Sequence, residues 1–306
     1  MARARKPANL DQQLERWSEA IIDDPASLKG RWKKTLLPEA REVRLDLGCG
    51  KGAFLARSAQ ANPDILYIGI DISSMCIARC AEKAITGKLG NMFVARADAA
   101  EIINLFEPGE LALIHLNFNA PYPPKKMATR RLTHLEHLVR YRTLLGENGI
   151  IELRTDNMPY WKWTLVELEI AGYHIDWKTE DLHGSGRPEL SALSGDPFVR
   201  SEYDEKLVQA GAVVYALRAH PGPAPQSMTQ TKKLGLVDYL PEDLDTLDRI
   251  PYGMEDTIIN MRNRKKNAAN AQARRDWWER NYGSKRPDKK TETRGKKGLG
   301  KEASEK

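Results

Sequence analysis

Cysteine is scarce in this sequence, and no long apolar stretch occurs in it. Three cysteines (Cys49, Cys76 and Cys80) among 306 residues are too few for a disulfide framework. No segment approaches the roughly 18 uncharged apolar residues of a membrane-spanning helix. No signal-peptide pattern follows the basic N-terminus. These shortages predict a cytoplasmic protein that does not engage a membrane.

Metal-ligand patterns are missing as well. The 6 histidines and the three cysteines do not combine into the spacings that zinc or another transition metal requires. We therefore expect no metal. Cys76 and Cys80 stand at helical spacing, so we expect them to share a helix face as small apolar residues.

Charge is present in quantity but is unevenly distributed. The whole chain holds 48 basic and 42 acidic residues, a net charge of +6. Residues 262–306 hold 16 basic and 6 acidic residues, a net charge of +10, which leaves 32 basic and 36 acidic residues, or −4, for the rest. A slightly acidic body with a basic C-terminal extension indicates a nucleic-acid partner.

Short apolar stretches alternate with amphipathic stretches of helical spacing. Strands are expected at 43–47, 66–70, 92–96, 111–118, 150–155, 173–178 and 212–219, and helices at 10–22, 52–61, 74–85, 131–145, 160–171 and 203–210. This alternation predicts an α/β protein with a doubly wound, Rossmann-like sheet that is mostly parallel and has an antiparallel C-terminal strand.

The predicted organisation has three parts. Residues 1–35 form an N-terminal arm and helix, and residues 36–220 form the α/β domain. Residues 221–306 begin with the proline-rich linker PGPAP, continue as a polar helix at about 255–281 and end in a basic, disordered tail. Residues 274–282 (RRDWWERNY) mix basic and aromatic side chains, which fits either RNA contact or a helix docked on the body.

A glycine-rich turn follows the first predicted strand in the sequence VRLDLGCGKGAF at 43–54. Glycines at such a turn let the backbone approach a nucleotide cofactor. The glycines at 48, 50 and 52 do not have the spacing of a dinucleotide-binding turn. Asp46 precedes them and would repel a pyrophosphate, but it suits the ammonium group of S-adenosylmethionine.

Two further acids follow the next two predicted strands. Asp71 ends the second strand, where a carboxylate can accept from both ribose hydroxyls, and Asp98 follows the third, within reach of the adenine amine. The alternative, that these are surface acids at strand ends, does not explain three acids in succession. Asp46, Gly48, Gly50, Asp71 and Asp98 are therefore expected to bind S-adenosylmethionine.

A series of motifs then resembles the bacterial tRNA (guanine-N7-)-methyltransferase family over about residues 4–218. The motifs are RKP at 5–7, the glycine turn, LNF at 116–118, RRLT at 130–133, TDN at 155–157, DLH at 181–183 and SEYD at 201–204. The resemblance implies a class I methyltransferase fold, S-adenosylmethionine as cofactor, tRNA as partner, and methylation of N7 of a guanine in the variable loop.

The chain departs from the family in one loop. Family members have the sequence Pro-Asp-Pro-Trp followed by a lysine, whereas this chain has NAPYPPKKM at 119–127. The catalytic aspartate of the family falls on Ala120, and its substrate-binding lysine falls on Pro124. A methyl group cannot stabilise the cation that forms on the base, so Asp156 is the best candidate for a replacement acid.

The loop also has an alternative interpretation. Asn-Ala-Pro-Tyr resembles the Asn-Pro-Pro-Tyr motif of methyltransferases that act on exocyclic amines, in which an asparagine accepts from the amine and an aromatic ring stacks on the substrate. Asn119 and Tyr122 are candidate catalytic residues for such altered specificity. A third alternative is a catalytically silent protein that binds cofactor and tRNA.

The resemblance also gives candidate substrate-binding residues. Asp156, Ser201 and Asp204 are expected to hold the base, and Arg130 and Arg131 to contact tRNA phosphates. Helix capping is the alternative role for the first three, and a solvated helix start is the alternative for the arginines. His183 is expected to be structural, and the protein is expected to be a monomer or a homodimer.

Overall fold

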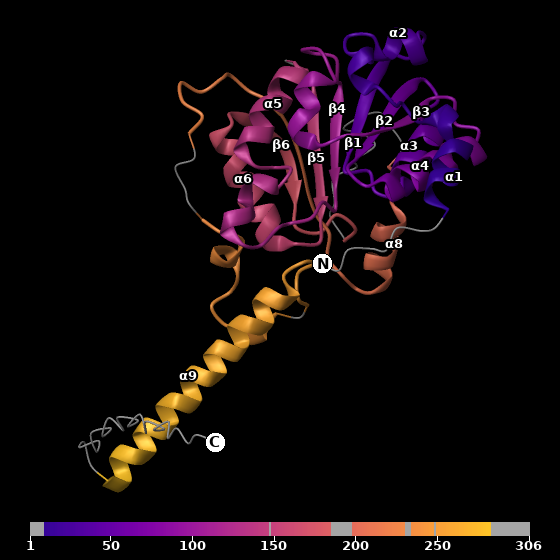
Figure 1. The fold of residues 1–306 in the computed structure, drawn as a ribbon. Helices are drawn as coiled ribbons and strands as arrows, with labels where there is room; N and C mark the ends of the chain where they lie inside the picture. The colour runs from indigo at the N-terminus through magenta and orange to yellow at the C-terminus, as the bar shows by residue number, and fades with distance from the viewer. Residues whose placement is uncertain (1–8, 147, 185–197, 230–233, 248, 283–306) are drawn as a thin grey trace, which may run out of the picture. The chain divides into compact units, whose positions relative to one another are not determined.

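The computed structural model describes residues 9–146, 148–184, 198–229, 234–247 and 249–282 (Figure 1). Contacts within the chain divide it into two compact units, Met1–Ile258 and Ile259–Lys306. The first unit contains the sheet and all the predicted site residues. The second unit contains most of one long helix.

One seven-stranded sheet forms the centre of the first unit, in the order β3-β2-β1-β4-β5-β7-β6. The strands β1 to β5 are parallel, and β7 runs antiparallel to both β5 and β6. This confirms the predicted α/β class and the antiparallel C-terminal strand. The strands are β1 (Glu42–Leu47), β2 (Ile65–Asp71), β3 (Met92–Arg96), β4 (Leu113–Asn117), β5 (Ile150–Thr155), β6 (Tyr173–Thr179) and β7 (Tyr215–Pro221).

Helices follow most of the strands. The α-helices are α1 (Leu10–Arg16), α2 (Trp32–Leu36), α3 (Ala53–Ala61), α4 (Ser74–Thr86), α5 (Leu135–Leu145), α6 (Met158–Ile170), α8 (Glu202–Gln209) and α9 (Glu255–Tyr282). Short 3₁₀ helices are η1 (Ser18–Ala20), η2 (Pro25–Leu28), η3 (Ala99–Asn104), η4 (Lys125–Arg130), η5 (Leu236–Tyr239) and η6 (Leu244–Thr246).

The strand order reverses between β1 and β4. From β1 the chain moves outward through β2 to β3, then returns to β4 beside β1 and moves the other way to β5. Because parallel crossovers are right-handed, α3 and α4 cover one face of the sheet and α5 and α6 the other (Figure 1). In such sheets a ligand binds at the carboxyl ends of the strands beside this reversal.

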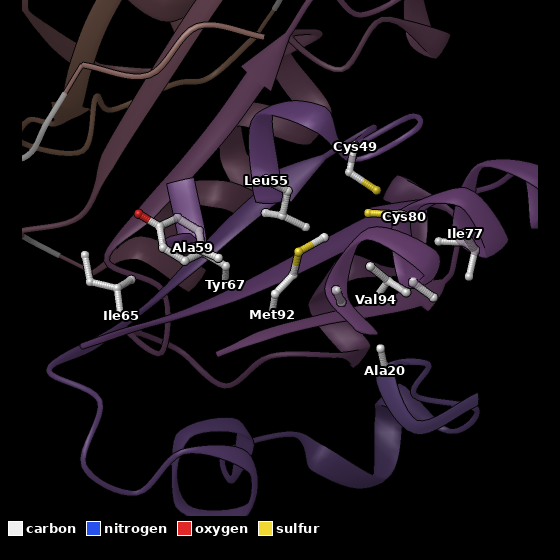
Figure 2. Packing of buried hydrophobic residues seen from close by; sticks show 12 residues of the cluster. Ala20, Cys49, Leu55, Ala59, Ile65, Tyr67, Ile77, Cys80, Met92 and Val94 are labelled. Atoms are coloured by element: carbon white, nitrogen blue, oxygen red, sulfur yellow. The ribbon is translucent and has the colours of Figure 1, made fainter. Parts of the chain in front are cut away.

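Buried apolar side chains pack α3 and α4 against β2 and β3 (Figure 2). Cys49 and Cys80 belong to this cluster and are free thiols. A β-carbon on Gly52 would lie 2.2 Å from Cys80 Sγ, and Gly52 has a left-handed φ of 73°. Only glycine therefore allows the turn after β1 to pack this closely on α4.

Two predicted helices differ from the observed ones at their ends. The N-terminal helix stops at Arg16 instead of residue 22, because Ile22 N–H donates to Val94 O (2.8 Å) and draws the chain into an extended path. The helix expected at 131–145 begins at Leu135, where His134 caps its backbone. Residues 125–130 instead form η4.

From β7 to Ile258 the chain belongs to the first unit and packs within it. Leu236, Met254 and Ile258 are buried, and η5 contacts α6. The structured chain therefore continues past the proline-rich linker. The domain boundaries after residues 35 and 220 stay predictions, and residues 283–306, expected to be disordered, lie outside the described residues.

The long helix α9 spans 28 residues and is rich in basic side chains. Residues 262–275 hold six basic residues and no acid. In the described parts of the chain, no helix combines the length and apolar character needed to cross a membrane.

Candidate functional site

A cleft of about 450 Å³ lies at the carboxyl ends of the central strands. Its walls come from the segments that follow β1, β2, β3 and β4 and from the chain leading into α5. The lining residues used below are Gly48, Asp71, Asp98, Phe118, Asn119, Ala120, Tyr122 and Arg130. The cleft coincides with the reversal in strand order, as the fold predicts.

The glycine turn forms the floor of this cleft. Gly48 has a φ of 77°, and a β-carbon there would lie 2.6 Å from Asn119 Nδ2. Gly50 also has a left-handed φ, of 55°, and its N–H donates to Asp71 Oδ2 (3.0 Å). Asp71 Oδ1 accepts from Ser73 N–H (2.8 Å), so this carboxylate connects the turn to the start of α4.

Asp46 lies behind the turn and is 2% exposed. Burial raises the pKa of its carboxyl from 3.8 to about 7, although the Asn117 side chain opposes this shift. Its Oδ1 atom has no hydrogen-bond partner among the described residues. A buried oxygen without a partner is well suited to accept from a cationic donor group.

The predicted cofactor residues therefore gather in one place. Gly48, Asp71 and Asp98 line the cleft, Gly50 hydrogen-bonds to Asp71 in its wall, and Asp46 immediately precedes the lining residue Leu47 in β1. Asp98 is exposed and caps η3 by accepting from Ala100 N–H (2.9 Å). Each carboxylate oxygen can accept more than one hydrogen bond, so capping leaves Asp98 able to bind a ligand.

The unusual loop after β4 forms the opposite wall. Phe118 and Tyr122 have positive φ values of 51° and 45°, which are uncommon for residues with side chains. Asn119 Nδ2 donates to Leu47 O (3.0 Å), while its Oδ1 is buried with no partner among the described residues. Ala120, at the position where the resemblance places the family's catalytic aspartate, is among the residues that line the cleft.

The two neighbouring arginines have different roles. Arg130 is exposed, lines the cleft and lies over the Tyr122 ring (5.1 Å). Arg131 is fully buried and donates to the backbone oxygens of Pro121 (2.9 Å) and Tyr122 (2.9 Å). In the structure Arg131 therefore holds the proline-rich loop, and a contact with a tRNA phosphate stays a prediction for both arginines.

Asp156 follows β5 and lies outside the set of residues that line the cleft. Its Oδ2 accepts from Tyr203 O–H (3.3 Å), and its Oδ1 is buried without a partner among the described residues. Burial is the main cause that raises the pKa of this carboxyl, and Arg249 opposes the shift. Asp156 Oδ1 can therefore accept further hydrogen bonds.

Ser201 and Asp204 form the N-terminal capping box of α8. Asp204 is fully buried, lies 3.6 Å from Arg154 Nη1 and pairs with His183 Nε2 (2.9 Å). The capping alternative therefore describes what these side chains do in the structure. A direct contact with the base stays a prediction for both, and His183 has the structural position that was expected.

Three residues that the sequence did not single out belong to this region. Tyr203 lies beside Asp156, and Tyr252 contacts Tyr203 with 6.1 Å between ring centroids. Arg154 lies between Asp204 and the Phe54 ring (5.2 Å). Tyr203 stands inside the SEYD motif, but no pattern in the sequence connects Tyr252 with Asp156.

Comparisons with known proteins show the family of this chain. Residues 40–217 match the family described as "Putative methyltransferase". The tRNA (guanine-N(7)-)-methyltransferase of Streptococcus uberis is 33% identical over 217 residues, which cover 71% of this chain and 99% of that protein. The chain belongs to the tRNA (guanine-N7-)-methyltransferase family.

Further members of the family show the same relation. The tRNA (guanine-N(7)-)-methyltransferase of Streptococcus sanguinis is 32% identical, with 71% of this chain and 98% of that protein covered. Among solved structures, the 16S rRNA methyltransferase KamB is 16% identical with a TM-score of 0.47 and covers 62% of this chain and 92% of that one. The matched family ends at residue 217, so η5, η6 and α9 lie beyond it.

Proposed function

We propose that this methyltransferase transfers a methyl group from S-adenosylmethionine to N7 of a guanine in the variable loop of tRNA. Membership of the family carries the proposal. The three acids at or just after the ends of β1, β2 and β3 support the choice of donor, since Asp71 and Asp98 line the same cleft as Gly48 and Asp46 lies in the strand that leads into the glycine turn.

The residues present fit S-adenosylmethionine. The unpartnered Oδ1 of Asp46 suits the ammonium group, Asp71 suits the ribose hydroxyls, and Asp98 suits the adenine amine. When bound, the donor supplies a methyl group on a positively charged sulfur. Gly48 and Gly50 present backbone without a side chain where the ligand approaches.

The reaction at N7 needs positioning and charge more than proton transfer. Guanine N7 has an available lone pair, so no base has to remove a proton first. The purine becomes cationic as the bond forms, and a nearby carboxylate in a water-poor site would stabilise that charge. Ala120 cannot do so, and we assign this role to Asp156.

A second candidate is methylation of an exocyclic amine. One observation favours it: Asn119 Oδ1 is buried without a partner among the described residues, at the edge of the cleft beside Tyr122. An amide oxygen in this position can accept from an amine. Family membership ranks this candidate below N7 methylation.

Nucleoside analysis decides between the two. tRNA lacking modifications is incubated with the protein and S-adenosylmethionine, digested and analysed by mass spectrometry. We expect 7-methylguanosine. An N-methylated amine nucleoside in its place would reject the N7 proposal, and no methylated nucleoside would reject both. The cytoplasmic location and the monomeric or homodimeric state stay predictions.

A further inference from the structure

We propose that residues 249–254, which lie beyond the matched family, form one wall of the target-base site, with Tyr252 as a base-contacting residue beside Asp156. This inference rests on the proposed function. It assigns part of substrate recognition to an extension outside the methyltransferase domain that the family shares.

Two contacts hold this segment against the catalytic region. Asn157 Nδ2, at the turn after β5, donates to Tyr252 O (2.8 Å). Gly253 has a left-handed φ of 73°, and a β-carbon there would lie 2.9 Å from Pro121 Cγ. Pro251 and Met254 are buried on either side. The segment is therefore packed on both the Asp156 turn and the Asn-Ala-Pro-Tyr loop.

An aromatic surface runs from the donor cleft to this segment. Phe118 lines the cleft and meets the Tyr203 ring edge-on, with centroids 4.9 Å apart. Tyr203 in turn meets Tyr252, with centroids 6.1 Å apart. Tyr203 and Tyr252 remain 36% and 38% exposed, so both rings have surface left for a ligand. Aromatic faces of this kind stack on unpaired bases.

A carboxylate lies within this aromatic surface. Asp156 accepts from Tyr203 O–H through Oδ2 and keeps Oδ1 without a partner among the described residues. A guanine carries N–H donors on its edge, including the exocyclic amine, which a carboxylate oxygen can accept. Aromatic rings for the base plane and a carboxylate for its edge are the two elements that recognition of a splayed-out purine requires.

Tyr252→Ala in the full-length protein tests the proposal. We expect the KM for tRNA to rise about tenfold, the size of one lost stacking contact, with kcat within about twofold of the unmutated enzyme. Tyr252→Phe should restore the KM because it keeps the ring. Tyr252→Leu keeps apolar contact without a ring and should behave like Tyr252→Ala, even if alanine destabilises the segment.

Val237→Ala is the matched control, since Val237 is an exposed side chain on the same extension. It should leave the KM for tRNA unchanged. Calorimetric binding of S-adenosylmethionine should be the same in all variants, because none of these residues lines the donor cleft. A KM unaltered by Tyr252→Leu would overturn the proposal, and so would a rise in kcat/KM, which would show that the segment obstructs the site.

Filter binding of tRNA separates this inference from the proposed function. If the unmutated protein transfers no methyl group, the proposed function fails, but tRNA affinity still compares Tyr252→Leu with Val237→Ala. In that case, weaker tRNA binding by Tyr252→Leu but not by Val237→Ala would support the proposal that residues 249–254 form a wall of the base site. Equal binding by the two variants would reject it.

Discussion

Asp46 is buried and is one of the proposed cofactor-binding residues, so its protonation would link stability to ligand binding. Burial raises the pKa of its carboxyl from 3.8 to about 7 in the folded protein. Between these values the folded state binds more protons than the unfolded state. The contribution of Asp46 to the free energy of unfolding therefore falls as pH rises from about 4 to about 7.

Asp46→Asn removes this titration and keeps the shape of the side chain. We expect the stability of the variant, relative to the unmutated protein, to increase from pH 5 to pH 8 in the absence of cofactor. Urea unfolding at both pH values measures this difference, and other titrating groups cancel in the comparison. A difference that does not change with pH would contradict the raised pKa.

The affinity for S-adenosylmethionine should depend on pH in the opposite direction to stability, through the same residue. The ammonium group of S-adenosylmethionine favours the ionised carboxylate, so affinity should rise as pH increases through about 7. Calorimetry at pH 6 and pH 8 compares the unmutated protein with Asp46→Asn. We expect the variant to bind more weakly and to lose most of this pH dependence.

Ala120 is the second residue whose chemistry can be tested directly. Its side chain lines the cleft, so Ala120→Asp places a carboxylate where the family has one. We expect the rate of guanine-N7 transfer to rise at least about tenfold, because the charge would stabilise the cationic purine. Ala120→Asn is the control of similar size without charge. Equal rates for the two variants would argue against charge stabilisation at this position.

Some residues of the candidate site could be predicted from the sequence, and others could not. Asp71 and Asp98 were predictable because acids at successive strand ends must gather at one edge of a parallel sheet. The bonds from Arg131 to the loop were missed because the sequence does not show that three loop carbonyls would need a buried donor. Tyr252 was missed because its place beside Asp156 depends on a contact between residues far apart in the chain.

At the scale of elements, the loop between β4 and α5 depends on Arg131 for its shape. The guanidinium donates to the carbonyl oxygens of three consecutive loop residues and lies 4.5 Å from the Trp163 ring centroid. Burial lowers its pKa to about 10, which leaves it charged at neutral pH. The Arg131 side chain thus stabilises a loop in which two residues other than glycine have positive φ values.

Arg131→Ala should lower the free energy of unfolding by about 3 kcal/mol, because it leaves buried carbonyls without a donor. Methyl transfer should fall with it as the Asn119–Tyr122 wall loosens. Arg130→Ala is the matched control: it should leave the unfolding free energy within about 0.5 kcal/mol and weaken tRNA binding only. Equal stability of the two variants in urea would show that Arg131 does not hold the loop.

Element positions were predicted better than element ends. All seven strands were expected close to their observed places, since apolar runs bounded by turn residues mark them. The helix expected from residue 131 starts at Leu135, because tertiary contacts of Arg131 and the cap at His134 replace its first turn. Periodicity in the sequence carries no information on such contacts.

At the scale of the whole molecule, the basic charge and the candidate catalytic residues lie in different parts of the chain. Residues 262–306 carry a net charge of +10 and the remainder carries −4. An acidic body gives little general attraction for a polyanion. We therefore expect most of the salt-dependent affinity for tRNA to come from α9 and the residues after it.

A truncation after Met261 tests this division. We expect tRNA affinity at low salt to fall at least about tenfold, and the slope of log affinity against log salt concentration to become less steep. Donor binding should not change, because the cleft lies wholly in residues 47–137. Unchanged tRNA affinity and slope would show that this part of the chain is not an RNA-binding arm.

The strand order of the sheet has a consequence for synthesis on the ribosome. Among the strands that the structure describes, β6 pairs only with β7, which follows it more than thirty residues later and is inserted between β5 and β6. While those residues are being translated, β6 has no neighbour and β5 ends the sheet. The residues that line the cleft all precede β6 in the chain, so they have been synthesised before β7 completes the sheet.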